Sequence, residues 1–197
     1  LKKQSLTFAK PANRQTIIRR IYHDLIGLKP TFEQVTAFVN DRAQDAYANL
    51  VDQLLASPRF GERWGRHWLD VARYADTKGY LAGGESRAYP YAYTYRDWVI
   101  KALNKDLPYD EFIRKQLAAD FLTNEPNDGD LAALGFLTAG PVFLNRKQLI
   151  IDDQIDLVTR GLMGFTVACA RCHNHFHDPI PTADYYSLYG IFDASNK

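Results

Sequence analysis

The sequence predicts a mostly α-helical protein, built as an irregular multi-helix single domain with long loops. Apolar residues recur at spacings of three and four along most of the chain, which is the period of an amphipathic helix. Glycine and proline interrupt this pattern where helices would end. The chain has 197 residues, of which 46% are hydrophobic and 24% charged, so one globular domain can form a core of useful size.

Two helices open the chain. An apolar face from Ile17 to Leu25 marks the first, and Gly27 is placed to end it. Thr31 is a suitable N-cap for the second helix, which we expect to be short and to run to about Val39.

Two further helices complete the first half. The third covers residues 46–55 and stops at Ser57-Pro58, because proline disfavours the helical conformation in the residue before it. The fourth carries a single apolar stripe, made of Phe60, Trp64, His67, Trp68, Val71 and Ala75.

The helical pattern fails from Asp76 to Tyr95, where three glycines and a proline predict a long loop. Four tyrosines alternate with period two in its second half, at Tyr89, Tyr91, Tyr93 and Tyr95. Trp98 then starts a helix that closes at Asn104, and the next helix opens at Pro108.

The last third of the chain begins with a polar loop at 124–130 and a short helix at 131–137. A long helix then leads directly to Cys169, with an apolar face made of Ile151, Ile155, Val158, Leu162 and Phe165. A final helix bears Tyr185, Leu188, Tyr189 and Phe192.

The run Cys169-Ala170-Arg171-Cys172-His173 contains both cysteines of the chain. C-x-x-C-H is the pattern of covalent haem attachment, in which two thiols bind the haem vinyl groups and the histidine binds the iron. Positions three apart also face one side of a helix. The sequence therefore predicts one covalent haem c near the C-terminus, held by Cys169 and Cys172, with His173 as the proximal ligand.

Other chemistry fits the same thiols. A C-x-x-C pair can be a redox disulfide or half of a zinc site. Residues 169–178 hold two cysteines, three histidines and an aspartate, which is dense enough for zinc or iron. In this alternative the candidate ligands are Cys169, Cys172, His173 and His175, and His177 beside Asp178 could also bind a metal with His175.

The second axial position of a haem iron indicates the kind of function. A strong ligand there favours electron transfer, and an open position favours chemistry at the iron. His67 is the candidate ligand, because it lies on the predicted apolar stripe and a buried imidazole needs a partner. A core histidine bonded to a backbone carbonyl is the alternative. Met163, the only methionine, is better explained by packing.

Three polar groups follow His67 at the end of the fourth helix. Arg73, Tyr74 and Asp76 could supply hydrogen bonds or protons to a distal pocket, and a surface ion pair is the simpler interpretation. Arg171 could pair with a haem propionate or with Asp178. The tyrosine-rich loop could cover the haem, stack on sugar rings or pack onto the domain.

Several function classes find no support. The net charge of +1 does not favour nucleic acid or anionic lipid as a partner. No apolar run of 18 residues predicts a transmembrane helix, and no signal peptide is recognisable. No phosphate-binding loop, serine elbow or selected carboxylate pair appears, so the residues do not decide whether the protein is an enzyme.

The chain opens with Leu1, so we expect a segment of a longer protein. Covalent haem is normally attached outside the cytoplasmic membrane. We therefore expect an exported protein, periplasmic or extracellular, whose export signal was removed or lies outside this segment.

Ordered motifs along the chain point to one family; they lie at 19–22, 27–31, 54–58, 61–64, 67–70, 73–76, 95–100, 169–173, 178–180 and 184–186. Together they resemble PSCyt2, or DUF1549, a cytochrome-associated family of planctomycetes, from Thr16 to Phe192. The resemblance implies a module of large exported bacterial proteins, often joined to other cytochrome-like or carbohydrate-linked domains. Where the family usually has Lys-Phe after the equivalent of His175, this chain has Phe176-His177.

The leading hypothesis is a c-type haem-binding domain for electron transfer or redox sensing, with a redox protein or a flanking cytochrome-like domain as its partner. The first alternative is a haem enzyme with an open distal site near His67, Arg73 and Tyr74. The second is a non-haem zinc or iron module whose metal site is structural. Its role would be binding, with polysaccharide as a candidate ligand.

Overall fold

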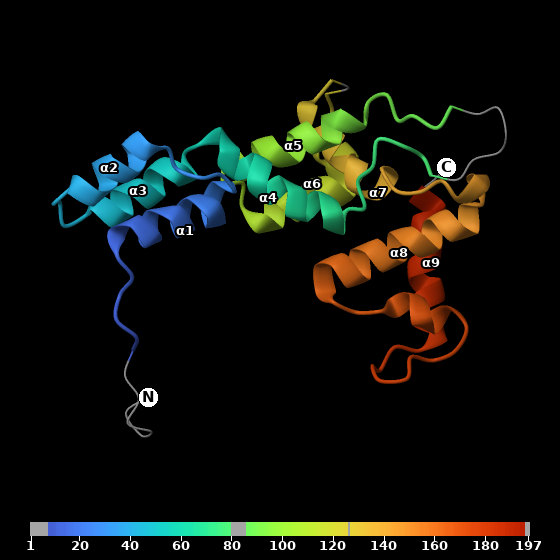
Figure 1. The fold of residues 1–197 in the computed structure, drawn as a ribbon. Helices are drawn as coiled ribbons and strands as arrows, with labels where there is room; N and C mark the ends of the chain where they lie inside the picture. The colour runs from blue at the N-terminus through green and yellow to red at the C-terminus, as the bar shows by residue number, and fades with distance from the viewer. Residues whose placement is uncertain (1–7, 80–85, 126, 196–197) are drawn as a thin grey trace. The chain divides into compact units, whose positions relative to one another are not determined.

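The computed structural model describes residues 8–79, 86–125 and 127–195. Over these residues the chain forms nine α-helices and short 3₁₀ segments, and its only β pairing is an isolated bridge between Thr77 and Ala88 (Figure 1). The mostly α-helical fold is thus confirmed. Residues 80–85, in the predicted tyrosine-rich loop, lie outside the described residues.

The chain divides into two compact units, residues 1–64 and 65–197. The boundary falls inside one helix, α4 (Pro58–Val71). Each unit contains apolar clusters of its own. The single-domain organisation stays a prediction.

The first unit contains α1 (Arg14–Ile26), α2 (Phe32–Asn40) and α3 (Ala46–Leu55). Gly27 ends α1 with a φ of 70°, in the left-handed region that glycine adopts without steric cost. Thr31 caps α2 in a capping box, as the sequence predicts. The three helices share one core, made of Ile18, Ile21, Tyr22, Phe38, Ala46, Leu50 and Leu54.

Helix α4 differs from its prediction in length and in its buried face. It ends at Val71 because Arg73 turns the chain with a φ of 57°, so Ala75 is not helical. Of the predicted stripe, Trp64 and Val71 are 42% and 39% exposed and His67 is exposed.

In the second unit Gly65 of α4 is buried, Trp68 is partly buried, and Ala72, just after the helix, is buried. A Cβ on Gly65 would lie 3.2 Å from the side chain of Ile100. The absence of a side chain at Gly65 therefore lets α4 approach α5 closely. A face of this kind lacks large apolar residues, so the apolar pattern of the sequence does not reveal it.

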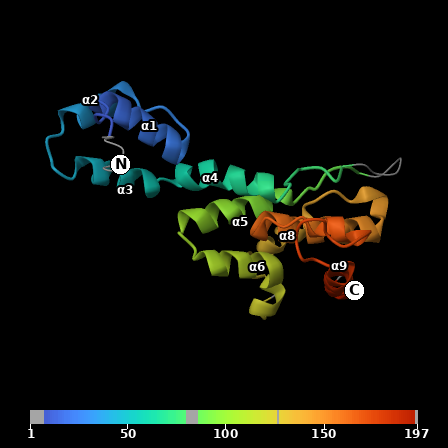
Figure 2. The same ribbon diagram turned by 90° about the horizontal axis from the view of Figure 1, so that it is seen from below.

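The main core of the second unit includes α5 (Ala92–Asn104), α6 (Tyr109–Leu122), η2 (Gly129–Leu134) and α7 (Gly135–Thr138). Helices α5 and α6 form a hairpin (Figure 2), with Trp98 stacked on Phe112 at 5.3 Å. The loop is shorter than predicted: it was expected to extend to Tyr95, but α5 begins at Ala92. Tyr93 and Tyr95 are therefore helical, and only Tyr95 is buried.

The rest of the second unit is built from η3 (Phe143–Asn145), α8 (Lys147–Met163), η4 (Val167–Arg171) and α9 (Thr182–Ser195). Helix α8 ends at Gly164, whose φ is 76°. Phe165 is therefore outside the helix and 45% exposed, contrary to its predicted place on the apolar face. A third cluster joins α8, η4 and α9, made of Ile151, Ile155, Val167, Ala170 and Tyr185.

Candidate functional site

The two cysteines lie in the segment between α8 and α9, residues 164–181, here called the cysteine loop. Cys169 belongs to η4 and Cys172 caps its C-terminal end. Both thiols are free and exposed. In a 3₁₀ helix the side chains at i and i+3 eclipse each other, so this local structure places both thiols on one side.

His173 is exposed, and one of its two ring nitrogens is hydrogen-bonded. Its Nδ1 lies 2.7 Å from the carbonyl oxygen of Asn174. A carbonyl only accepts, so Nδ1 donates and the neutral ring keeps its lone pair on Nε2. Phe176 contacts the same ring edge-on at 5.0 Å. Metal-binding histidines typically have this arrangement, in which one nitrogen donates to a carbonyl and the other binds the metal.

His175 has the opposite environment. Its side chain is 7% exposed, and its Nδ1 accepts from the backbone amides of His177 and Asp178 at 3.2 and 2.9 Å. Nε2 therefore carries the proton and donates to Thr166 Oγ1 at 2.9 Å. Because both ring nitrogens are engaged, His175 folds the loop in this structure and offers no metal ligand.

Asn174 completes the folding of the loop. Its Oδ1 accepts from the backbone amide of Thr182 at 3.0 Å, at the first residue of α9. The amide of His175 also donates to the carbonyl of Ile180 at 2.9 Å. The chain after the motif is thus tied to the start of α9 by its own polar groups.

Arg171 anchors the motif to both neighbouring helices. Its guanidinium lies 3.2 Å from Asp152 on α8, and the hydroxyl of Tyr185 on α9 donates to the same carboxylate at 2.6 Å. Tyr186 donates to the carbonyl of Arg171 at 3.3 Å. Of the two partners considered for Arg171, Asp178 is not the one found: the ion pair is with Asp152, which is distant in sequence.

The charges around Asp152 act on its neighbours. The negative charge of Asp152 raises the pKa of Arg171, so the guanidinium is cationic at any physiological pH. Burial raises the pKa of Tyr185, and the hydrogen bond to Asp152 raises it further, so the phenol stays protonated.

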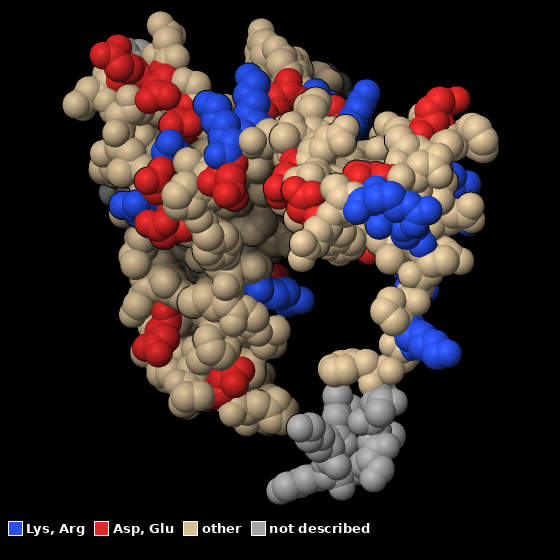
Figure 3. Space-filling view, turned by 90° about the vertical axis from the view of Figure 1, so that its left-hand side faces the viewer, with Lys and Arg blue, Asp and Glu red and all other residues tan. Residues whose placement is uncertain are grey.

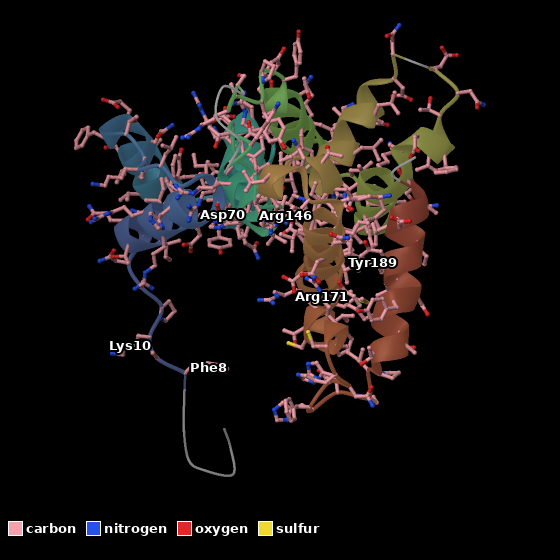
Figure 4. All side chains as sticks on the ribbon, turned by 90° about the vertical axis from the view of Figure 1, so that its right-hand side faces the viewer. Phe8, Lys10, Asp70, Arg146, Arg171 and Tyr189 are labelled. Atoms are coloured by element: carbon pink, nitrogen blue, oxygen red, sulfur yellow. The ribbon has the colours of Figure 1, made fainter. Side chains whose placement is uncertain are left out.

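Large apolar side chains are exposed in and beside the cysteine loop (Figure 4 labels Arg171 in this region): Met163 (55%), Phe165 (45%), Phe176 (85%) and Tyr186 (54%). Met163, for which packing was the preferred explanation, is thus more than half exposed at the end of α8. A porphyrin is a large apolar plate, and exposed aromatic side chains are the surface on which such a plate can rest. These residues and the motif geometry fit a covalently bound haem.

The remaining predicted site residues lie on α4 and the turn after it. His67 is exposed rather than buried, and its role as an iron ligand stays a prediction. Arg73 pairs with Asp153 on α8, where burial lowers the pKa of its guanidinium. Tyr74 donates to Asp76 at 2.7 Å. The contacts found for Arg73 and Tyr74 among the described residues join the turn to its own surroundings, not to the cysteine loop.

The alternative metal site is not assembled. Within residues 8–79, 86–125 and 127–195, no group of three or more His, Cys, Asp or Glu side chains is gathered to hold a metal ion. In addition, both ring nitrogens of His175, one of the four candidate ligands, are engaged in hydrogen bonds.

The residues that support the motif carry no signal in the sequence. Asp152 is 19 residues from Arg171 and 33 from Tyr185, so no local spacing could join them. Their contact depends on α8 packing against α9, which a single sequence does not reveal.

A family model matches the chain over residues 1–197; it is PSCyt2, described as a protein of unknown function, DUF1549. The chain belongs to the PSCyt2 family. The resemblance drawn from the ordered motifs is thereby confirmed, and the family's name connects it with cytochromes. No curated protein and no solved structure matches this PSCyt2 chain. No helix in its described part is long and apolar enough to span a membrane.

Proposed function

We propose that this PSCyt2 domain carries one haem c, bound through Cys169 and Cys172 with His173 as the proximal ligand, and that it serves electron transfer or redox sensing. One observation carries the proposal. Two free, exposed thiols on a 3₁₀ turn are followed directly by an imidazole whose Nδ1 is bonded to a carbonyl.

The chain's own residues have distinct roles in this proposal. The thiols hold the porphyrin edge, and the bond from His173 to Asn174 orients the imidazole. Arg171 uses one nitrogen for Asp152 and retains other donors, which suit a haem propionate. When bound, the haem supplies one-electron chemistry at its iron.

The exposure of the site favours transfer to a partner over chemistry in a closed pocket. Both thiols and the imidazole of His173 are at the surface, so a bound haem would have an edge within reach of another protein. We therefore propose a redox protein or a flanking cytochrome-like domain as the partner, and an exported location, where covalent haem is normally attached.

The test is a spectrum of protein produced with a c-type haem maturation system. Reduced protein in alkaline pyridine is expected to show the bands of a haem with two thioether links. A Cys169→Ala/Cys172→Ala variant, matched in every other respect, is expected to show none. Stoichiometric zinc without a Soret band in the wild type would overturn the proposal.

Carbon monoxide separates electron transfer from the enzyme alternative. Two firm axial ligands exclude it, whereas an open distal site binds it and changes the reduced spectrum. His67→Ala should alter the iron spin state if His67 is the second ligand, and an unchanged spectrum removes it from that role.

A further inference from the structure

The charges of the protein are unevenly divided between its two units. Residues 1–64 contain ten Lys and Arg against six Asp and Glu, a net charge of +4. Residues 65–197 contain fourteen against seventeen, a net charge of −3. The overall value of +1 conceals this asymmetry. In Figure 3, several Lys and Arg side chains (blue) lie close together on the right-hand part of the face shown.

Part of the positive charge of the first unit surrounds a hollow of about 610 Å³. The hollow is lined by Thr16, Arg19, Arg20, His23, Asp24, Lys29, Pro30 and Val35. This volume lies within the range of about 300–1,000 Å³ that is typical of small-molecule sites. Its walls are polar on the α1 side and apolar at Pro30 and Val35.

The fold of the first unit builds this hollow. Thr16, Arg20 and His23 follow one another at spacings of four and three, so they share a face of α1. The opposite face, with Ile18 and Ile21, is buried in the core and fixes the orientation of the helix. The left-handed turn at Gly27 then returns the chain, so that Lys29 and Pro30 line the same hollow.

Three of the cations in the hollow have no acidic partner among the described residues: Arg19, Arg20 and Lys29. Other basic groups of the unit do have contacts. Arg59 pairs with Glu62 at 2.6 Å, and Arg14 donates to the carbonyl of Phe38 at 2.7 Å. The acid in the hollow, Asp24, lies 3.7 Å from His23 instead.

We propose that this hollow binds a small ligand with at least two oxyanion groups, of the phosphate or carboxylate class. The planar guanidinium groups of Arg19 and Arg20 match such groups in bidentate fashion, and Lys29 adds a point charge. Pro30 and Val35 provide the apolar wall against which the body of the ligand rests. This site is independent of the haem proposal, because its residues belong to the other unit.

Isothermal titration of the whole chain tests the site, with pyrophosphate and citrate as probes and sodium chloride at matched ionic strength as the reference. We expect one saturable site for at least one of the two probes. Binding of pyrophosphate alone identifies a phosphoryl ligand, binding of citrate alone a polycarboxylate, and binding of both the shared chemistry. Heat that only follows ionic strength overturns the proposal.

The variants locate the binding. Arg19→Gln/Arg20→Gln should weaken it at least about tenfold, and Lys29→Gln should weaken it less. Arg42→Gln is the matched control, because Arg42 is exposed in the same unit but does not line the hollow. Equal losses in the control and in the double variant would mean diffuse charge attraction and would overturn the site. Circular dichroism checks that each variant folds, and Lys29→Gln alone still tests the site if the double variant does not.

Discussion

Two polar regions of the second unit use their hydrogen bonds differently. In the core, Gln116 accepts from Trp68 and Tyr95 at 2.7 Å each and donates to the carbonyl of Phe112 at 3.0 Å. We call these residues the glutamine network. In the cysteine loop, by contrast, the thiols of Cys169 and Cys172 face solvent.

The difference separates structural polar groups from reactive ones. The glutamine network satisfies its members with one another, as buried polar groups require. The hydrogen bonds of the cysteine loop engage the groups that shape it, Arg171, Asn174 and His175. They leave the thiols and Nε2 of His173 available. A region built only for stability has no reason to expose its most reactive groups in this way.

The largest effect is expected in the glutamine network. Gln116→Ala leaves the buried hydroxyl of Tyr95 without its acceptor, and Trp68 retains only its 3.2 Å hydrogen bond to that hydroxyl. The change also creates a cavity, so it should lower the free energy of unfolding by about 2–4 kcal/mol. Urea denaturation measures this. Gln148→Ala, at an exposed position on α8, should change it by less than about 0.5 kcal/mol. Similar values for the two variants would contradict the structural role of the network.

The support of the motif should come next. Asp152→Ala removes the partner of Arg171 and Tyr185 at once and should cost about 1–3 kcal/mol. Asp110→Ala breaks the exposed pair with Arg114 and should cost only about 0.3–0.5 kcal/mol. Hydrogen exchange should accelerate in residues 166–186 of the Asp152 variant. Acceleration spread evenly over the unit would mean that Asp152 does not anchor the motif in particular.

The two histidines after His173 provide a sharper pair. His175→Ala removes the acceptor of two backbone amides and the donor to Thr166, so it should cost about 1–2 kcal/mol and expose the amides of His177 and Asp178 to exchange. His177→Ala alters an exposed ring and should be nearly neutral. If His177 proved the more costly of the two to replace, the assignment of the loop's central imidazole would be wrong.

The smallest effect is a pH dependence at Asp130 of η2, which is bonded to both helices of the hairpin. The hydrogen bond from Lys115, and a second from Trp98, lower the pKa of Asp130 below its ordinary value of 3.8. A lowered pKa in the folded state stabilises the protein above the unfolded value, and this contribution is lost as the pH falls through the folded pKa. Asp130→Asn should therefore be less stable than the wild type near neutral pH. The difference should shrink below about pH 4 in urea titrations, and a difference that grew there would contradict the sign.

Much of the fold was predictable because helix ends are local. Gly27 and Thr31 act through their own dihedral angles and side chains, so their sequence positions reveal the ends of α1 and α2. The buried face of α4 was not predictable, because it depends on the absence of a side chain at Gly65 where Ile100 approaches. Close packing of small residues leaves no apolar periodicity to detect.

In the candidate site, too, local features were predictable from the sequence and tertiary contacts were not. The thiols and His173 are adjacent in sequence, so their chemistry can be recognised from the motif alone. The groups that orient them depend on tertiary contacts, as Asp152 does, or on a loop conformation that makes His175 an internal acceptor. The motif selects His173, but it does not reveal that His175 is buried and engaged through both ring nitrogens, because this depends on the conformation of the loop.

The most direct test of the account is tandem mass spectrometry of the peptide that contains Cys169 and Cys172, from protein matured with c-type haem. We predict one haem on this peptide, with a thioether at each sulfur, and a single link in each of Cys169→Ala and Cys172→Ala. A peptide recovered with both sulfurs joined to each other, or unmodified under conditions that load a control cytochrome c, would contradict it.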